Sequence, residues 1–379
     1  MKSAIQTLLT QGPVDEASIT AFLRSHSSFP IVEGRQATFV YHGAAEAVHL
    51  RHWVYGLASS QSFERVPGTN LWYHTLEIPP QSRVEYKLEI VQDGNRQWIR
   101  DPLNPNLAHD PFGANSVAHG QGYQRPAWTE HDPDARQGTI KEMVFTETAL
   151  GGPRRVSVYL PARFRETRRY PLLIVHDGGD YVRYASLQTV LDNLIHRNEV
   201  APLVVALTHP VDRLGEYPNN AAHATFIAEQ LLPAMQDKFP IYEKPASRCL
   251  MGASFGGVAA LATAWRYPGT FGRLLLQSGS FAFTDIGESK RGPNFAKVVE
   301  FINAFRDAPG KPSEKVYLSC GTYESLIYEN RTMVPVLQGT GMEVRYEEAR
   351  DGHNWENWRD RLRSGLSWLF PGPLWMVYE

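Results

Sequence analysis

Short segments with alternating apolar and polar positions, separated by turn signals, occupy the chain from about residue 30 to about residue 120. Val84–Val91 alternates cleanly and stops at Asp93-Gly94, which predicts a hairpin with Arg96–Arg100 as the returning strand. The pattern also predicts the strands Thr38–Tyr41, Val48–Val54 and Leu71–Ile78. Several strands at this spacing favour a β-sandwich. Ahead of them, Asp15–Arg24 is expected to form a short helix with Asp15 as its cap.

The pattern changes after residue 138, where short apolar runs alternate with longer amphipathic segments. Such runs are typical of strands buried on both faces of a sheet. The predicted strands are Arg155–Leu160, Pro171–Val175, Leu203–Leu207, Arg248–Met251, Val316–Cys320 and Glu343–Glu347. The predicted helices are Ser186–His196, Ala222–Lys238, Phe255–Tyr267 and Trp358–Leu369. Strands alternating with helices indicate an α/β domain with a mainly parallel sheet and helices on both faces.

A polar segment rich in Gly and Pro separates the two patterns. It spans residues 121–138 and is the expected linker. The chain of 379 residues is long enough for two domains. We therefore expect a β-sandwich with a leading helix in residues 1–120 and an α/β domain in residues 139–379.

Composition excludes several classes of protein. With 38 Lys and Arg against 40 Asp and Glu, the net charge is −2, so bulk charge gives no attraction to nucleic acid. Two cysteines, Cys249 and Cys320, are too few for a disulfide framework or a Cys-rich zinc site. No apolar run approaches the roughly 18 residues of a membrane span. The first ten residues are a poor match to a signal peptide, so a cytoplasmic location is expected.

The sequence Gly252-Ala-Ser-Phe-Gly256 fits the pattern G-x-S-x-G between a predicted strand and a predicted helix. In a nucleophile elbow this turn is sharp, and small residues at both ends avoid collisions with the neighbouring backbone. Ser254 would then present its hydroxyl at the head of a helix, where backbone N–H groups favour a developing oxyanion. We interpret Ser254 as a catalytic nucleophile.

A serine hydroxyl needs a base to remove its proton. In this fold class the histidine comes last along the chain, after the acid. His353 lies in the loop between the strand Glu343–Glu347 and the terminal helix, so it is the candidate base. His176 and His209 are the two other histidines that could border the site.

The acid is expected between the nucleophile and the base. Glu324 follows the buried strand Val316–Cys320 at its carboxyl end, and we choose it to orient the imidazole. Glu329 and Asp351 are the alternatives, and a dyad without an acid is conceivable.

An oxyanion hole needs two N–H donors. Phe255, the residue after the nucleophile, is expected to give one. The loop His176–Asp180 directly follows a predicted strand and is expected to give the other, where glycine would let the backbone approach a substrate carbonyl. Gly179 is the choice for this donor, with Gly178 and Asp180 as rivals.

With these motifs in place, the sequence resembles the enterochelin (ferric enterobactin) esterases within the esterase D group of serine hydrolases. The resemblance covers nearly the whole chain. The segments that carry it are Asp101–Pro105, Asp110–Val117, Asp177-Gly178, Arg213–Asn220, Glu229–Pro233, Gly252–Gly257, Ser278–Ser280 and Gly352–Arg359.

The resemblance implies an α/β-hydrolase fold, no cofactor, and hydrolysis of the trilactone backbone of catecholate siderophores in the cytoplasm. By position, Ser254, Glu324 and His353 match the triad of the family, and Arg213 matches its substrate-side arginine. From the residues alone, Arg213 could meet an anionic substrate or form an ion pair with Glu216 that shapes its loop. The first domain resembles the immunoglobulin-like early-set domains of these esterases.

Other residues bear on the substrate. Asp180, Tyr181, Phe281 and Phe283 would give a more apolar and aromatic pocket than a highly anionic siderophore requires. Relatives that share these motifs also cut feruloyl, acetyl and other simple esters. Trp53, Trp72 and Trp98 in the first domain suggest either a carbohydrate platform or, more often on alternating strands, core positions.

These observations combine into one hypothesis, a serine carboxylic-ester hydrolase that works through an acyl-enzyme. Siderophore trilactone is the first substrate candidate. The alternatives are small acyl, aryl or feruloyl-type esters, or an acyltransferase with the same triad. The expected partner is a small-molecule ester, without nucleic acid, membrane or metal, because no H-E-x-x-H, paired-Cys or calcium-loop motif is present.

Overall fold

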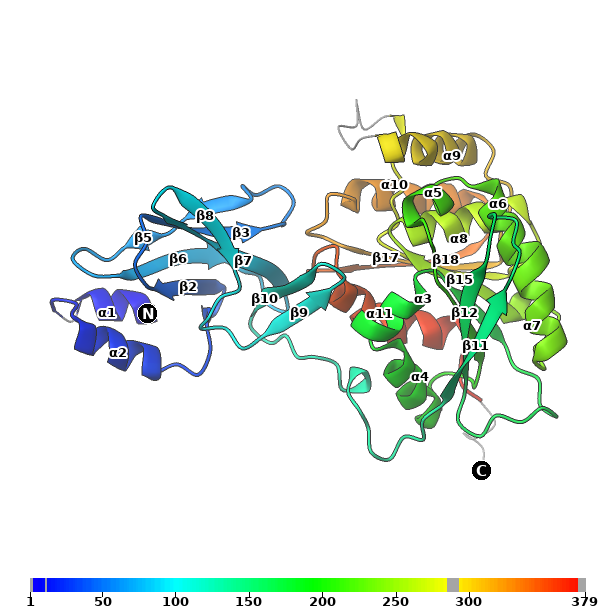
Figure 1. Cartoon of the computed structure of the whole chain (residues 1–379), viewed down its shortest axis with the longest axis horizontal. Coiled ribbons are helices and arrows are strands. Elements are labelled where there is room, and N and C mark those ends of the chain that lie inside the picture. Colours follow the sequence, from blue (N-terminus) through cyan, green and yellow to red (C-terminus); the bar gives the residue numbers. More distant parts are fainter. Residues whose placement is uncertain (1–2, 11, 285–292, 374–379) are drawn as a thin grey trace. The chain divides into compact units, whose positions relative to one another are not determined.

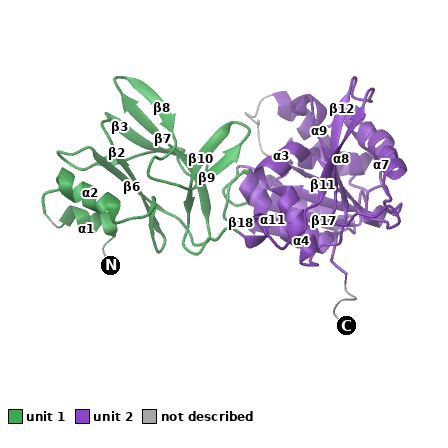
Figure 2. Cartoon of the chain, turned by 60° about the horizontal axis from the view of Figure 1, so that its bottom comes forward, with its two compact units in different colours: residues 1–125, 321–324, 349–354 green, residues 126–320, 325–348, 355–379 purple. Residues whose placement is uncertain are grey.

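A computed structural model describes residues 3–10, 12–284 and 293–373 of the chain (Figure 1). Two compact units can be separated by their internal contacts, and Figure 2 colours them differently. The first unit contains residues 1–125 together with the short segments 321–324 and 349–354. The second contains residues 126–320, 325–348 and 355–379. The chain therefore crosses from one unit to the other several times.

Two helices, α1 (Ala4–Thr10) and α2 (Glu16–Arg24), begin the first unit. Asp15 caps α2 as expected: its side chain accepts the N–H of Ser18, and the Ser18 hydroxyl in turn accepts the N–H of Asp15. The helix α1 was not predicted, although Ser3 and Gln6 form a capping box at its start: the Ser3 hydroxyl accepts the N–H of Gln6, and Oε1 of Gln6 accepts the N–H of Ser3.

The rest of the first unit consists of two antiparallel β-sheets. One has the strand order β1-β2-β6-β5, and the other has the order β4-β3-β7-β10-β9 with β8 paired to β7. The strands are β1 (Ile31–Glu33), β2 (Gln36–His42), β3 (Ala47–His52), β4 (Ser60–Ser62), β5 (Glu64–Arg65), β6 (Leu71–Glu77), β7 (Arg83–Gln92), β8 (Asn95–Ile99), β9 (Leu107–Asp110) and β10 (Gly113–His119).

Apolar side chains from both sheets form one buried cluster. Phe39 of β2 and Trp72 of β6 belong to it, together with Leu50 of β3 and Tyr86 of β7. The hairpin predicted at Asp93-Gly94 is present, with Gln92 opposite Asn95. The pattern thus located the five strands it predicted. Buried positions alternate cleanly in β3, whereas β8 has no buried position and was found through its hairpin signal.

The second unit contains an eight-stranded sheet with the order β11-β12-β14-β13-β15-β16-β17-β18. The strands β14, β13, β15, β16 and β17 run parallel to one another, whereas β11 and β12 are antiparallel. The strands are β11 (Thr139–Phe145), β12 (Arg154–Leu160), β13 (Leu172–Val175), β14 (Val204–Thr208), β15 (Arg248–Ala253), β16 (Arg273–Gln277), β17 (Lys315–Gly321) and β18 (Glu343–Ala349).

Helices connect these strands. They are α3 (Gly178–Tyr184), α4 (Leu187–His196), α5 (Arg213–Glu216), α6 (Ala221–Thr225), α7 (Leu232–Lys238), α8 (Phe255–Arg266), α9 (Ala296–Asp307), α10 (Ile327–Gly339) and α11 (Trp355–Leu369). A π-helical segment, Phe226–Leu231, joins α6 to α7. The predicted helix 222–238 is therefore three consecutive helical segments.

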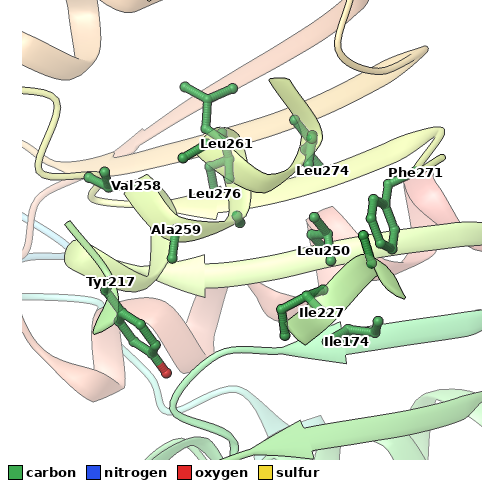
Figure 3. Close-up of a cluster of buried hydrophobic side chains, with 14 of the residues drawn as sticks. Ile174, Tyr217, Ile227, Leu250, Val258, Ala259, Leu261, Phe271, Leu274 and Leu276 are labelled. Atoms are coloured by element: carbon green, nitrogen blue, oxygen red, sulfur yellow. The ribbon is translucent and has the colours of Figure 1, made fainter. Parts of the chain in front are cut away.

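Side chains of the sheet alternate between two hydrophobic clusters. In β13, Leu172 and Ile174 belong to the cluster formed with α7, α8, α9 and α10, part of which Figure 3 shows. Leu173 and Val175 belong to the other cluster, formed with α3, α4 and α11. Both faces of the sheet are therefore covered by helices, which explains why its strands read as continuous apolar runs.

The expected linker, residues 121–138, contains the division between the units, which falls after Arg125. Its second part is held within the second unit. The side-chain amide of Asn193 in α4 donates to the carbonyls of Trp128 and Glu130. The N–H of Gly138 donates to Asp192.

Cys249 and Cys320 are both buried thiols. Among the residues that the structure describes, no helix is both long enough and apolar enough to cross a membrane.

The central position of β13 leads to a test of the core. Ile174 is 0% exposed, whereas Ile140 in β11 of the same sheet is 38% exposed. We expect Ile174→Ala to lower the free energy of unfolding by about 2–5 kcal/mol, because it removes buried methyl groups and leaves a cavity. Ile140→Ala is the matched control and should cost less than about 1 kcal/mol. Urea titration measures both, and equal losses would contradict the burial described above.

Candidate active site

The turn between β15 and α8 has the geometry of a nucleophile elbow. The strand β15 is buried along its whole length, and α8 begins at Phe255. Between them Ser254 has φ 57° and ψ −122°, a conformation that residues with a side chain rarely adopt. The surrounding contacts hold it there: its N–H donates to Gln277, and its carbonyl accepts the N–H groups of Gly257 and Ser280.

The two glycines of the motif are required for different reasons. A Cβ on Gly252 would lie 2.3 Å from the carbonyl carbon of Gly256, so strand and helix approach too closely for any side chain. A Cβ on Gly256 would lie 3.2 Å from the Cβ of His176. The expected collision with backbone is therefore found at Gly252, whereas Gly256 is limited by a neighbouring side chain.

The hydroxyl of Ser254 has a second serine beside it. Its Oγ lies 3.1 Å from the Oγ of Ser280, which follows β16, the next strand in the sheet. Sequence reasoning recognised Ser278–Ser280 as a motif but gave Ser280 no role. The adjacency of β15 and β16 could have indicated that Ser280 lies near Ser254, because residues after neighbouring parallel strands meet at one edge of a sheet.

Glu324 and His353 form a hydrogen-bonded pair in the first unit. The Nδ1–H of His353 donates to Oε2 of Glu324 at 2.7 Å, and the other oxygen of Glu324 accepts the N–H of Gly321 at 2.7 Å. The Glu324 side chain is fully buried, whereas that of His353 is 37% exposed. This arrangement fixes the tautomer, since a proton on Nδ1 leaves Nε2 with a lone pair.

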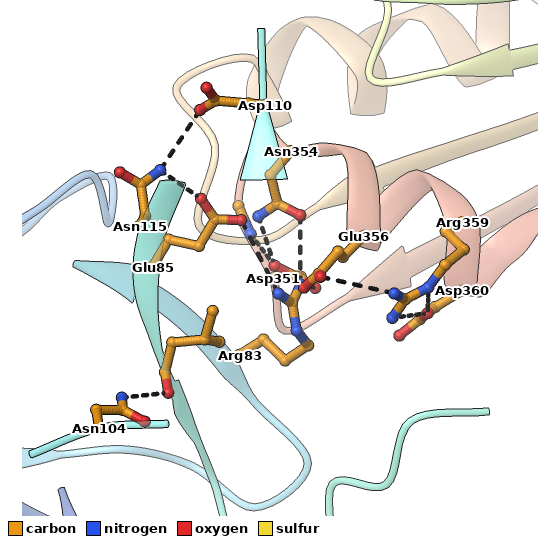
Figure 4. Close-up of polar contacts among 12 residues, drawn as sticks. Arg83, Glu85, Asn104, Asp110, Asn115, Asp351, Asn354, Glu356, Arg359 and Asp360 are labelled. Carbon is orange, nitrogen blue, oxygen red and sulfur yellow. Dashed lines mark hydrogen bonds and ion pairs between the residues drawn. The ribbon is translucent and has the colours of Figure 1, made fainter. Parts of the chain in front are cut away.

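The alternative acids lie in other environments. Asp351 pairs with Arg83, whose Nη1 lies 2.8 Å from Oδ2 of the carboxylate (Figure 4). Burial raises the pKa of Asp351, and Arg83 opposes that rise. Glu329 is a buried residue of α10. Glu324, the acid chosen from sequence, has a hydrogen bond to His353.

Arg213 forms an ion pair, but with a different partner from the one considered. Its Nε lies 3.0 and 2.9 Å from the two carboxylate oxygens of Asp177. Glu216 instead pairs with Arg154 at 2.9 Å. The ion pair with Glu216, one of the two roles considered for Arg213, is therefore wrong, because Arg154 on β12 pairs with that carboxylate.

The glycines after β13 are explained by packing. A Cβ on Gly178 would lie 2.5 Å from Leu207, and one on Gly179 would lie 2.8 Å from the ring of His209. Both residues belong to the first turn of α3, whose first N–H groups have no acceptor within the helix. The ring of His209 is held by the Ser157 hydroxyl at 2.8 Å.

His176 lies under the elbow in a buried pair with His223. Its Nδ1–H donates to the carbonyl of Met251, so its Nε2 accepts from Nε2–H of His223 at 3.0 Å. Burial lowers the pKa of His176. Burial, together with His176 and Arg154, holds the pKa of His223 well below its ordinary value. Both rings are therefore neutral and structural.

Several aromatic residues expected at the pocket belong to the core. Tyr181, Phe281 and Phe283 are buried members of the two hydrophobic clusters, so the expected aromatic pocket lining was wrong for them. In the first unit, Trp72 is buried as predicted for a core position, whereas Trp53 and Trp98 are 54% and 45% exposed. No group of three or more metal-ligating side chains occurs within the described ranges.

The close approach at the elbow predicts a strong effect of one methyl group. Gly252→Ala should lower the free energy of unfolding by about 1–3 kcal/mol or prevent folding, since the backbone of α8 must move. Gly339→Ala is the control: its Cβ would meet nothing within 4 Å, and alanine suits a helix end at least as well. Urea titration of both variants is the measurement, and a fully stable Gly252→Ala protein would refute the described packing.

The buried histidine pair predicts a pH dependence of stability. Below about pH 6.5 the unfolded chain protonates His223 while the folded protein does not, so the unfolded state binds more protons. The free energy of unfolding should therefore fall as pH falls from 6.5 to 5, by up to about 1.4 kcal/mol per pH unit for this residue. His223→Gln keeps a hydrogen-bond donor for His176. Its free energy of unfolding, measured by urea titration at each pH, should fall less steeply as the pH falls. His131→Gln, at an exposed position, should keep the wild-type slope.

Comparison with known proteins places the chain in a family. The sequence profile of the Esterase family matches residues 147–369, more than half of the chain. The iron(III) enterobactin esterase of Dickeya dadantii is 26% identical over 360 residues, covering 82% of this chain and 80% of that protein.

Solved structures show the same fold. The ferric enterobactin esterase of Salmonella typhimurium has a TM-score of 0.76 at 21% identity, covering 92% of this chain and 98% of that chain. The enterobactin esterase of Shigella flexneri, crystallised in the presence of enterobactin, has a TM-score of 0.73 at 22% identity, covering 92% and 97%. The chain belongs to the Esterase family, of the enterochelin esterase-like type, and is a carboxylic ester hydrolase.

Proposed function

We propose that the protein is a serine esterase in which Ser254 is the nucleophile, His353 the general base and Glu324 the residue that orients it. Two observations carry this proposal: the elbow conformation of Ser254, and a preformed Glu324–His353 hydrogen bond elsewhere in the same chain. The strands β15 and β17, separated by β16 alone, are parallel, and Glu324 follows β17. Residues after the carboxyl ends of such strands lie at one edge of a sheet.

The reaction has two halves. Nε2 of His353 takes the proton of the Ser254 hydroxyl while Oγ attacks the ester carbonyl, and the imidazolium then protonates the departing alcohol. In the second half His353 removes a proton from water, which attacks the acyl-enzyme and releases the acid. Glu324 holds the ring and stabilises its charged form throughout, because its carboxylate is buried and accepts the Nδ1–H.

The oxyanion would be stabilised by backbone N–H groups. Phe255 is the first residue of α8, so its N–H has no acceptor within that helix. Gly179 in the first turn of α3 is the proposed second donor. Arg213 is the proposed substrate contact, since Asp177 holds its guanidinium in place while 34% of the side chain stays exposed.

For the substrate we propose the trilactone of a catecholate siderophore. Proteins with the name iron(III) enterobactin esterase match most of this chain, which supports the choice. The net charge of −2 favours the alternative, a carboxylesterase of small acyl, aryl or feruloyl-type esters, because a ferric catecholate is highly anionic.

For the domains we propose residues 1–120 as an immunoglobulin-like early-set domain, 121–138 as a linker and 139–379 as an α/β-hydrolase domain. Two antiparallel sheets around one shared apolar cluster support the first assignment. The strand order of the eight-stranded sheet, with Ser254 directly after β15, supports the last.

The mechanism is tested by Ser254→Ala against a panel of p-nitrophenyl esters and ferric enterobactin. We expect kcat to fall at least about 1,000-fold, because no other hydroxyl occupies the elbow. Ser62→Ala, at an exposed position of β4, should retain wild-type turnover. Mass spectrometry after treatment with a fluorophosphonate should find the label on Ser254.

Each result has a distinct meaning. Unchanged turnover by Ser254→Ala would contradict the serine mechanism. An enzyme that cleaves p-nitrophenyl esters but leaves the trilactone intact would contradict the siderophore substrate and favour the alternative. Turnover of p-nitrophenyl esters that is lost after dialysis against a chelator would contradict the expected independence from metal.

A further inference from the structure

An arginine at the start of β7 is buried to an unusual degree for its type. Arg83 is 1% exposed, and its guanidinium stays charged at any pH at which the protein folds. Its main-chain N–H donates to the carbonyl of Arg350 at 2.9 Å. A buried cation requires compensating partners, because removal of a charge from water is costly.

Two partners of Arg83 lie in the loop that contains His353, and a further carboxylate, that of Glu85 in β7, lies 3.9 Å from Nη2. Nη1 contacts Oδ2 of Asp351 at 2.8 Å and Oδ1 of Asn354 at 3.3 Å, as Figure 4 shows. The other oxygen of Asp351 accepts the N–H of Gly352 at 2.8 Å and the side-chain amide of Asn354 at 2.9 Å. Residues on both sides of His353 are therefore fixed by one buried ionic network.

A second set of contacts holds the loop that contains Glu324. The hydroxyl of Ser82, the residue before Arg83, lies 2.7 Å from the hydroxyl of Tyr323. The carbonyl of Tyr323 accepts the N–H of Tyr55 at 2.8 Å. The two loops are also joined to each other, since the N–H of Tyr323 donates to the carbonyl of Asp351 at 3.1 Å.

We propose that Arg83 is a positioning residue of the esterase reaction. From the proposed first domain, residues 1–120, here called the β-domain, it fixes the loop 350–354 and thereby the direction in which His353 presents Nε2. This inference rests on the proposed role of His353. Residues 350–354 lie between β18 and α11 and belong to no strand or helix. Contacts with other segments must therefore hold their geometry, and Arg83 supplies both a main-chain and a side-chain contact.

A poorly placed base should slow the chemical step without weakening substrate binding to the same extent. A misplacement of about 1 Å can cost on the order of 100-fold in rate. We therefore expect Arg83→Met to lower kcat for a p-nitrophenyl ester about 100-fold, with KM changed by less than about threefold. Arg83→Lys keeps the charge but not the planar fork, and should lower kcat about tenfold.

Arg96→Met is the matched control. Arg96 also belongs to the β-domain and pairs with a buried carboxylate, Glu89, at 2.7 Å, but its own side chain is 67% exposed. Its replacement should leave kcat within about twofold of the wild-type value. The double variant Arg83→Met, Asp351→Asn removes the buried cation together with its nearest carboxylate partner, and should recover thermal stability relative to Arg83→Met while kcat stays low.

The outcomes separate this inference from the proposed function. If the wild-type enzyme is not labelled at Ser254 and Ser254→Ala stays active, the proposed function fails. If the wild type passes that test, a folded Arg83→Met enzyme with kcat within twofold of wild type would overturn the positioning role. Recovery of kcat together with stability in the double variant would overturn it as well. If Arg83→Met does not fold, the lysine variant decides, and an unchanged kcat there refutes the proposal.

Discussion

The close approach of strand β15 to helix α8 is the constraint on which the site depends. With no room for a Cβ at Gly252, the chain must reverse within one residue, and Ser254 adopts a positive φ as a result. Such strain persists only where the surroundings are rigid. The sheet provides this rigidity, since its central strands are buried on both faces by two separate hydrophobic clusters. The same turn places the hydroxyl of Ser254 and the N–H of Phe255 at the head of one helix.

Ion pairs that contain a buried carboxylate shape loops in both units. Arg213 with Asp177, Arg154 with Glu216, and Arg83 with Asp351 each join segments that are distant in the sequence. A buried pair adds little to net stability, because desolvation of both charges offsets their attraction. What it does provide is directionality: only one arrangement of the loop satisfies both partners. In loops that present functional groups, this geometric constraint matters more than the energy of the pair.

The parts of the structure that sequence could predict are those with local signals. Alternation located strands such as β7, and the small residues around Ser254 indicated the turn. Contacts between distant residues left no such signal. Arg83 and Asp351 are 268 positions apart, and nothing near either residue indicates the other. For the same reason the partner of Arg213 was missed, and Phe281 was expected in a pocket although it packs in the core.

The division of the chain into compact units adds a final step to this reasoning. A βα fold supplies its active-site residues from loops, and loops without regular structure need partners for their backbone and side chains. Segments 321–324 and 349–354 find many of these partners in the β-domain, with which they form one unit. Glu324 and His353 therefore depend on the β-domain for their geometry, while Ser254 depends on the sheet. If the triad is as proposed, the β-domain is part of the catalytic apparatus rather than an appended module.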